Sequence, residues 1–137
     1  MVPKGDENIF HIDLMSRKPI YEQLGEQTGK LILAGVLHPL DKMPSVRSLS
    51  SRLSVNPNTI QRAYSDLCAR GLLTSMAGRG YYVTEDAEKI LKQEALKKFD
   101  ALDALIHDLE AAGIRRDEIL THIEGLPDTA EGGKNDD

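Results

Sequence analysis

The arrangement of this chain is governed by residues 45–71, which read SVRSLSSRLSVNPNTIQRAYSDLCARG. Ser45 opens the stretch and is followed by apolar residues at helical spacing, namely Val46, Leu49 and Leu53. A hydroxyl just before such a stripe is typical of a helix N-cap, because its oxygen accepts a hydrogen bond from a backbone N–H of the first turn. The pattern therefore predicts a short helix that begins after Ser45.

A second helix is predicted after a very short turn. Asn56 and Pro57 form an N-cap followed by a proline at the first helical position, where a missing N–H is tolerated. The helical pattern runs to Arg70 and stops at Gly71, which supplies the positive φ that a helix C-terminus commonly needs. Two short helices joined by so tight a turn predict a helix-turn-helix.

The second helix of this pair separates into two faces at 100° per residue. The apolar face, expected in the core, consists of Ile60, Ala63, Tyr64 and Leu67. The opposite face, with Thr59 at its flank, carries Asn58, Gln61, Arg62 and Ser65. Amide, hydroxyl and guanidinium groups can read base edges or bind phosphate oxygens. An ordinary solvated face would mix acids with bases, and this face has no acid, so nucleic-acid recognition is the favoured interpretation.

Further candidate DNA contacts lie outside this helix. Arg47 and Ser45 stand at the start of the first helix, whose free N–H groups can bind a phosphate, although Ser45 also fits a plain capping role. Arg79 lies in the turn of a predicted hairpin of residues 72–76 and 81–84, where it would enter a minor groove or belong to a simple turn. The complete predicted DNA-binding set is Ser45, Arg47, Asn58, Thr59, Gln61, Arg62, Gly78, Arg79 and Gly80.

Other elements are predicted on both sides of this region. Alternation over residues 8–14 allows a short strand, and a helix is expected from Pro19, as its first residue, to a break at residues 35–40. One long helix is predicted over residues 86–112 and a short one over about residues 116–125, followed by a flexible acidic tail, 127–137. The residues predicted to form a dimerisation face are Leu91, Ala95, Phe99, Leu102, Leu105, Ile106, Leu109, Ile119, Leu120 and Ile123.

Composition restricts the class of protein. The chain has 137 residues, too few for a large cofactor enzyme, and it has neither an apolar run that could span a bilayer nor an apolar secretory signal. A cytoplasmic location is therefore expected, with no membrane partner. Cys68 is the only cysteine and is expected to be a semi-buried packing thiol, while the four histidines are scattered. No catalytic residue, metal site or cofactor is predicted.

The formal net charge of −5 is unevenly distributed. Residues 1–84 carry ten Lys or Arg and seven Asp or Glu, a net charge of +3, whereas residues 85–137 carry seven and fifteen, a net charge of −8. Within residues 42–84, six basic side chains stand against one acid, Asp66. A polyanion would be attracted to this segment and repelled by the rest of the chain.

An ordered set of motifs strongly resembles the N-terminal winged helix-turn-helix of GntR-type bacterial transcription regulators. The motifs are KPIYEQL (18–24), KMPSVR (42–47), NPNTIQRAY (56–64), ARGLL (69–73) and GRGYYV (78–83). The short helical C-terminal region resembles the YtrA subfamily. Leu40 departs from the pattern, because the family usually has glycine there, and Ser48 stands where an acid would complete a capping box.

This resemblance implies a mostly helical chain with a β-hairpin wing and a homodimer on a two-fold symmetric operator. It assigns DNA contact to Arg47, to the start of the recognition helix and to the wing tip, which are residues already in the predicted set. Residues 1–84 would bind DNA and residues 85–126 would dimerise. The predicted function is a sequence-specific repressor, with control of a transporter operon implied by the subfamily. The alternatives are a protein-interaction module that uses the helix-turn-helix as scaffold and, less favoured, a small enzyme or metal sensor; a small-molecule effector is left open.

Overall fold

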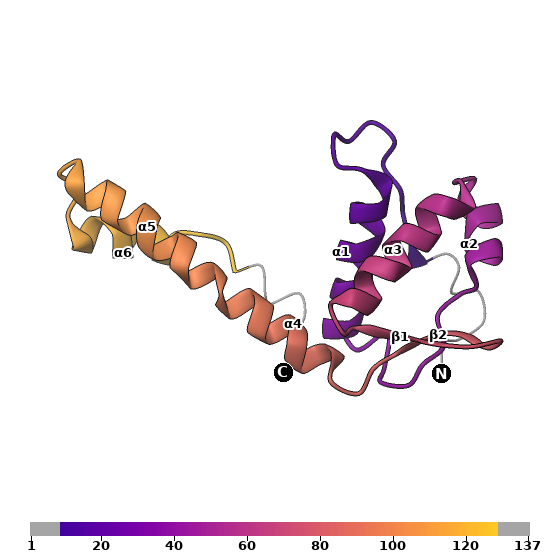
Figure 1. The fold of residues 1–137 in the computed structure, drawn as a ribbon. Coiled ribbons are helices and arrows are strands. Elements are labelled where there is room, and N and C mark those ends of the chain that lie inside the picture. Colours follow the sequence, from indigo (N-terminus) through magenta and orange to yellow (C-terminus); the bar gives the residue numbers. More distant parts are fainter. Residues whose placement is uncertain (1–8, 129–137) are drawn as a thin grey trace. The chain divides into compact units, whose positions relative to one another are not determined.

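The structure, a computed structural model, describes residues 9–128 and is mostly helical with a single β-hairpin (Figure 1). This confirms the predicted fold class. Among the described residues, no helix is both long and apolar enough to cross a membrane. The elements in chain order are α1 (Ile20–Leu33), α2 (Val46–Leu53), α3 (Pro57–Ala69), β1 (Leu73–Met76), β2 (Gly80–Val83), α4 (Ala87–Leu96), α5 (Lys98–Ala111) and α6 (Arg116–Glu124).

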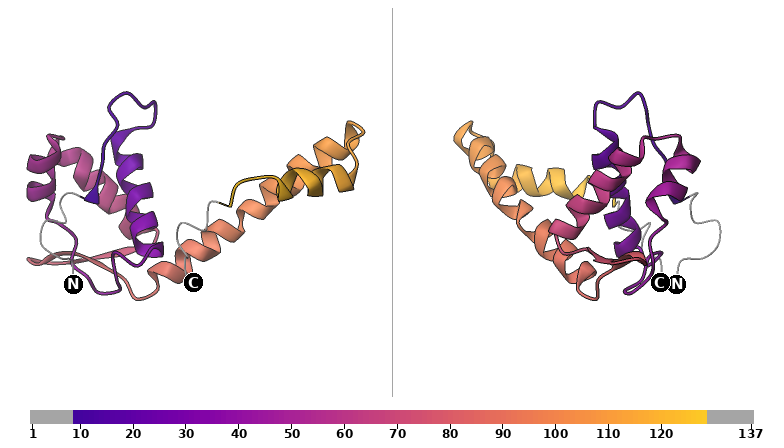
Figure 2. Two further views of the ribbon diagram at one scale, coloured as in Figure 1. Left: turned by 180° about the vertical axis from the view of Figure 1, so that it is seen from behind. Right: turned by 45° about the vertical axis from the view of Figure 1, so that its right-hand side comes forward.

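Contacts divide the chain into two compact units, with the division between Lys92 and Gln93, inside α4. In the first unit, α3 contacts α1, α2 and β1. Figure 1 shows α3 between α1 and α2, and both views of Figure 2 show it beside α1. The helix predicted to carry recognition is therefore the one around which the unit is assembled.

The core of the first unit is mostly aliphatic, with Phe10 and Tyr64 as its buried aromatic residues, and is built on the inner face of α3. Ile60, Ala63, Tyr64 and Leu67 are each at most 1% exposed, as the periodicity predicts. The hydroxyl of Tyr64 donates to the backbone oxygen of Pro44 at 2.8 Å, which ties α3 to the loop before α2. Other fully buried side chains from neighbouring elements include Leu24, Leu49, Leu72, Leu73 and Val83.

Side-chain caps define the N-termini of α2 and α3. Ser45 caps α2 by accepting from the backbone N–H of Ser48 at 3.0 Å. Asn56 caps α3 by accepting from the backbone N–H of Asn58 at 2.8 Å. Both caps are as predicted, and Gly71 follows α3 with a φ of 86°. Pro19, in contrast, is the N-cap of α1 rather than its first residue.

The wing is a hairpin with a third extended segment at its edge. β1 and β2 pair antiparallel, with Leu73 opposite Val83. On the other side of β2, the backbone N–H of Leu40 donates to the oxygen of Val83, and that of Met43 to the oxygen of Tyr81, both at 2.8 Å. The loop between α1 and α2 therefore anchors the wing to the core.

The predicted strand at the start of the chain is not formed in its described part, residues 9–14. Two glutamine side chains of α1 take the place of a partner strand. The Gln27 amide bonds the N–H and the carbonyl of His11 at 2.9 and 2.6 Å, and the Gln23 amide bonds those of Asp13 at 2.9 and 3.0 Å. Phe10 is buried in the core. The alternation thus marks an extended segment whose hydrogen bonds go to side chains instead of to another backbone.

The single long helix predicted over residues 86–112 is wrong in detail. α4 ends at Leu96 and α5 begins at Lys98, and the N–H of Asp100 donates to the oxygen of Lys97 at 3.2 Å, a three-residue spacing that starts a new helix. The start of α4 belongs with the first unit, because Leu91 is buried there. A Cβ added to Gly29 of α1 would lie 3.3 Å from Leu91 Cδ2, so the glycine makes this close approach possible.

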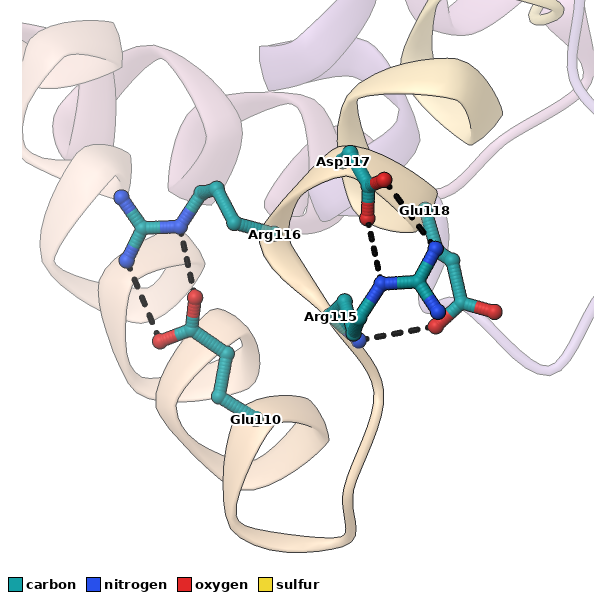
Figure 3. A network of polar contacts seen from close by, with 5 residues as sticks. All are labelled: Glu110, Arg115, Arg116, Asp117 and Glu118. Atoms are coloured by element: carbon teal, nitrogen blue, oxygen red, sulfur yellow. Dashed lines mark hydrogen bonds and ion pairs between the residues drawn. The ribbon is translucent and has the colours of Figure 1, made fainter.

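In the second unit, α5 and α6 are joined by charged side chains (Figure 3). The guanidinium of Arg116 donates to both carboxylate oxygens of Glu110, at 2.6 and 3.1 Å. Arg115 donates to both oxygens of Asp117 at 3.1 Å, and its backbone N–H donates to Glu118 at 2.8 Å. These bonds fix the entry into α6. The predicted acidic tail lies, from residue 129 onward, outside the described residues.

Candidate nucleic-acid interface

The outward face of α3 presents the polar side chains that the sequence singles out. Asn58, Gln61, Arg62 and Ser65 are exposed, and Thr59 at their flank is half-buried. The opposite face is completely buried, so the orientation of this surface is fixed by the core. A helix held in this way after a tight turn can enter the major groove, which is about 12 Å wide.

The start of α2 contributes a second basic position. Arg47 and Ser45 are both exposed. Ser45 is the N-cap of α2, and because its side chain is also exposed, the same hydroxyl is accessible to a phosphate. The first turn of α2 has no acidic residue, so the positive end of the helix dipole is not neutralised there. A phosphate is the kind of group that such a helix end binds.

The wing tip combines two left-handed glycines with exposed basic side chains. Gly78 and Gly80 have φ values of 75° and 109°, and Arg79 between them is exposed. A Cβ added to Gly80 would lie 3.4 Å from Cε of Lys42, which places a second cation beside the turn. Lys42 is the first residue of the basic segment 42–84, and its side chain lies beside Gly80 of the wing.

All nine predicted DNA-binding residues lie in the first unit, and none of them is buried. They come from three elements: the start of α2, the outer face of α3 and the β1–β2 turn. Asp66, the single acid of α3, is exposed. Groups that could bind phosphate and groups that could read bases are therefore present on one compact unit.

Sequence reasoning missed two tyrosines that contact this face. The Arg62 guanidinium carbon lies 3.7 Å from the centre of the Tyr21 ring, and Nη2 of Arg62 donates to the Tyr21 hydroxyl at 3.0 Å. Nε2 of Gln61 donates to the Tyr81 hydroxyl at 2.5 Å. Tyr21 belongs to α1 and Tyr81 to β2, and no local pattern links either tyrosine to its partner on α3.

The remaining chemistry-bearing residues point to packing. Burial raises the pKa of the Cys68 thiol, so this half-buried group stays protonated at neutral pH and is a poor nucleophile or metal ligand. In the part of the chain that the structure describes, no group of three or more His, Cys, Asp or Glu side chains is arranged to hold a metal ion.

The residues predicted to mediate dimerisation divide between the two units. Leu91 is 8% exposed and belongs to the core of the first unit. In the second unit Ile119 is buried and Ile106 half-buried, and both line an open cleft between α5 and α6. The exposed members are Ala95, Phe99, Leu102, Leu105, Leu109, Leu120 and Ile123.

Comparison with known proteins places these features in a family. The sequence profile described as "Bacterial regulatory proteins, gntR family" matches residues 20–83, from α1 to the end of the wing. The HTH-type transcriptional repressor YtrA of Bacillus subtilis is 35% identical over 130 residues, which cover 94% of this chain and all of that protein. The uncharacterised HTH-type transcriptional regulator YhcF of the same organism is 34% identical and covers 86% of this chain and 95% of its own length.

Solved structures give the same picture. A GntR family transcriptional regulator from Listeria monocytogenes is similar with a TM-score of 0.67 and 31% identity, covering 85% of this chain and all of its own. YtrA from Sulfolobus acidocaldarius, a GntR-family transcription factor, is similar with a TM-score of 0.52 and 32% identity, covering 84% and 93%. These relatives are regulators of transcription and not enzymes.

Proposed function

This chain belongs to the gntR family of bacterial regulatory proteins, and on that premise we propose that it is a homodimeric repressor that binds a two-fold symmetric DNA operator. Membership of the family makes it a DNA-binding transcriptional regulator; repression, dimerisation and operator symmetry are the proposal. Because a regulator of transcription acts on the chromosome, the proposal places it in the cytoplasm. Control of a transporter operon, implied by the resemblance to the YtrA subfamily, belongs to the same proposal.

The observation that carries the DNA-binding role is the polar outer face of α3, whose first two turns have no acid and whose single acid, Asp66, follows one turn after Arg62. Its inner face is fully buried, so Asn58, Gln61 and Arg62 are presented on a rigid helix. The recognition helix would enter the major groove, Arg47 would bind a backbone phosphate, and Arg79 would enter the adjacent minor groove. The net charge of +5 over residues 42–84 supports the same role, because it attracts the phosphate backbone.

Dimerisation is supported by the second unit. Six large apolar side chains of α5 and α6 are between 39% and 61% exposed, namely Phe99, Leu102, Leu105, Leu109, Leu120 and Ile123. Exposed apolar side chains in this number are typical of a surface that is covered by a partner. A second copy is the proposed partner, because two recognition helices about 34 Å apart would match the half-sites of a symmetric operator.

The proposal is tested by selecting genomic DNA fragments with the full-length protein and measuring its affinity for the recovered duplex. Arg47→Ala and Arg62→Ala are expected to weaken binding by about tenfold to a hundredfold each, since a good charged contact contributes about 1–3 kcal/mol. Lys89→Ala, an exposed cation in α4, is the matched control and should bind as the wild type does.

Two further measurements complete this test. Affinity should fall steeply with added salt, because bound cations are released from the phosphates. A reporter with the recovered duplex over its promoter should be less active when the protein is present. Equal affinity for the recovered duplex and a scrambled one would contradict operator binding, and would leave the protein-interaction module as the better interpretation. Higher reporter activity would contradict repression.

A further inference from the structure

We propose that Tyr21 and Tyr81 are positioning residues for DNA recognition, which order Arg62 and Gln61 on the face of α3 before DNA binds. The two partners are neighbours in sequence on the recognition helix, yet each is held by a tyrosine of a different element. The inference rests on the DNA-binding role of α3 and adds the residues that set its geometry. Neither tyrosine belongs to the set of residues predicted to contact DNA.

The first contact orders a long and flexible side chain. An exposed arginine samples many rotamers and loses that freedom when it binds a base or a phosphate. The Tyr21 ring lies under the guanidinium at 3.7 Å and its hydroxyl accepts from Nη2, so the plane and the direction of the group are both fixed. A guanidinium has five N–H donors, and the hydroxyl uses only one of them. Arg62 therefore keeps the donors that bidentate recognition requires.

The second contact connects Gln61 to the core through the wing. The Tyr81 ring meets the Tyr64 ring edge-on, with centroids 5.0 Å apart. Tyr64 is 1% exposed and is itself bonded to the oxygen of Pro44. Gln61 is thus connected through the Tyr81 ring to Tyr64, a fully buried residue of the core. Its second amide N–H and its carbonyl oxygen are not used by Tyr81, and these are the groups that can bond the edge of an adenine.

The two contacts also come from two separate elements, α1 and β2. α1 packs against α3, and β2 is the strand of the wing that the loop at residues 40–43 anchors. A preordered side chain binds more tightly than a mobile one with the same contacts, because less freedom is lost on association. The expected consequence is that removing a tyrosine weakens DNA binding only while its partner is present.

A double-mutant cycle with the full-length protein and the duplex recovered by selection tests this coupling. Tyr21→Leu should weaken binding about fivefold in the wild-type background and less than about twofold in the Arg62→Ala background, as expected for the loss of one exposed cation–π contact with its hydrogen bond. Tyr21→Phe, which keeps the ring, should give a smaller loss. Tyr81→Phe should be coupled to Gln61→Ala in the same way.

Tyr82→Phe is the matched control for the strand. Tyr82 is the next residue along β2, so its side chain points to the other face of the hairpin. It should show no coupling with Gln61→Ala. Thermal unfolding of each variant separates loss of binding from loss of folding, and Tyr21→Phe provides a variant of minimal change. Additive losses in the cycles would mean that the tyrosines act independently of Arg62 and Gln61, and would overturn the inference.

A measurement on the free protein distinguishes failure of this inference from failure of the proposed function. In the wild type, 15N relaxation of the Arg62 Nε–H group should report an ordered side chain, and in Tyr21→Leu a mobile one. Equal mobility in both proteins would overturn the positioning role even if DNA binding is intact. A wild type that is ordered at Arg62 but does not discriminate between duplexes would instead contradict the proposed function.

Discussion

At the scale of single residues, Leu40 adopts a left-handed backbone conformation that is unfavourable for a residue with a Cβ. Its φ is 72°, in the left-handed region that glycine adopts without strain, and the side chain is 63% exposed. The backbone N–H of Leu40 bonds the oxygen of Val83 at 2.8 Å, and this bond is part of the anchor that holds the wing. The conformation therefore serves the wing, while the leucine side chain contributes little packing in return.

Replacing this residue should stabilise the protein. Leu40→Gly is expected to raise the free energy of unfolding by about 1 kcal/mol, because the left-handed conformation costs a residue with a Cβ about 1–2 kcal/mol and part of this gain is offset by the freer unfolded chain. Urea denaturation gives the free energy. Leu40→Ala keeps the Cβ and is the control, with a change below about 0.5 kcal/mol. A glycine variant no more stable than the alanine variant would show that no strain is stored there.

Whether the role of a single residue can be predicted from the sequence depends on how far along the chain its partner lies. The caps formed by Ser45 and Asn56 and the buried face of α3 follow from residues within one or two helical turns, and the structure confirms them. The contact of Arg62 with Tyr21 joins residues 41 apart in sequence. Such a contact depends on how α1 packs against α3, which periodicity alone does not specify.

At the scale of elements, two errors of prediction concern the course of the backbone, one at residues 9–14 and one at Lys97. The alternation in residues 9–14 correctly indicates an extended segment, but its hydrogen-bonding partners are the Gln23 and Gln27 side chains of a helix. The interruption at Lys97 occurs in a run that favours helix throughout, without glycine or proline. At residues 9–14 the local pattern specifies an extended backbone, and the packing against α1 decides where its hydrogen bonds go. At Lys97 no contact among the described residues explains the interruption.

The pairing of α5 with α6 should depend on pH through Glu110. The hydrogen bond from Arg116 lowers the pKa of this carboxyl below its ordinary value of about 4.3. A carboxyl whose pKa is depressed in the folded state stabilises it above the ordinary pKa, and this contribution is lost as pH falls through the folded pKa. Helix content measured by circular dichroism should therefore decrease below about pH 4.

The same titration of a Glu110→Gln variant isolates this effect. Glutamine keeps the shape of the side chain but cannot ionise, so the variant should lose the part of the acid transition that belongs to the pair with Arg116. Glu88→Gln is the control, because Glu88 forms an exposed ion pair with Lys92 inside α4, 3.5 Å apart, and does not join two helices. If both variants follow the wild-type curve, the Arg116–Glu110 pair has no part in holding α5 to α6.

At the scale of the whole molecule, the net charge changes sign along the chain, and the helices α5 and α6 of the acidic half expose a series of large apolar side chains. Residues 42–84 carry a net charge of +5 because they contain a single acid, whereas residues 85–137 contain fifteen acids and carry a net charge of −8. A uniformly basic protein would bind DNA through many surfaces, whereas here the C-terminal half is repelled by phosphate. The half that avoids DNA is also the half with the large exposed apolar side chains of α5 and α6. This division of surfaces suits a protein that holds DNA with one unit and a second copy of itself with the other.

A charge placed on the apolar face should separate these two roles. Leu105→Glu in α5, where the leucine is 61% exposed, should turn a sedimenting dimer into a monomer at micromolar concentration, because burying an unpaired carboxylate in an apolar contact is strongly unfavourable. Leu14→Glu, at a leucine 78% exposed in the loop before α1, is the matched control and should remain dimeric. The Leu105 variant should keep its helix content by circular dichroism, since its side chain is largely exposed within one copy, and should bind a single half-site as the wild type does. Its affinity for the symmetric operator should fall, because a monomer cannot bind both half-sites at once and so loses the affinity gained from two linked recognition helices. A monomeric wild type, or a Leu105→Glu variant that sediments as a dimer, would contradict the assignment of α5 and α6 to the dimer contact.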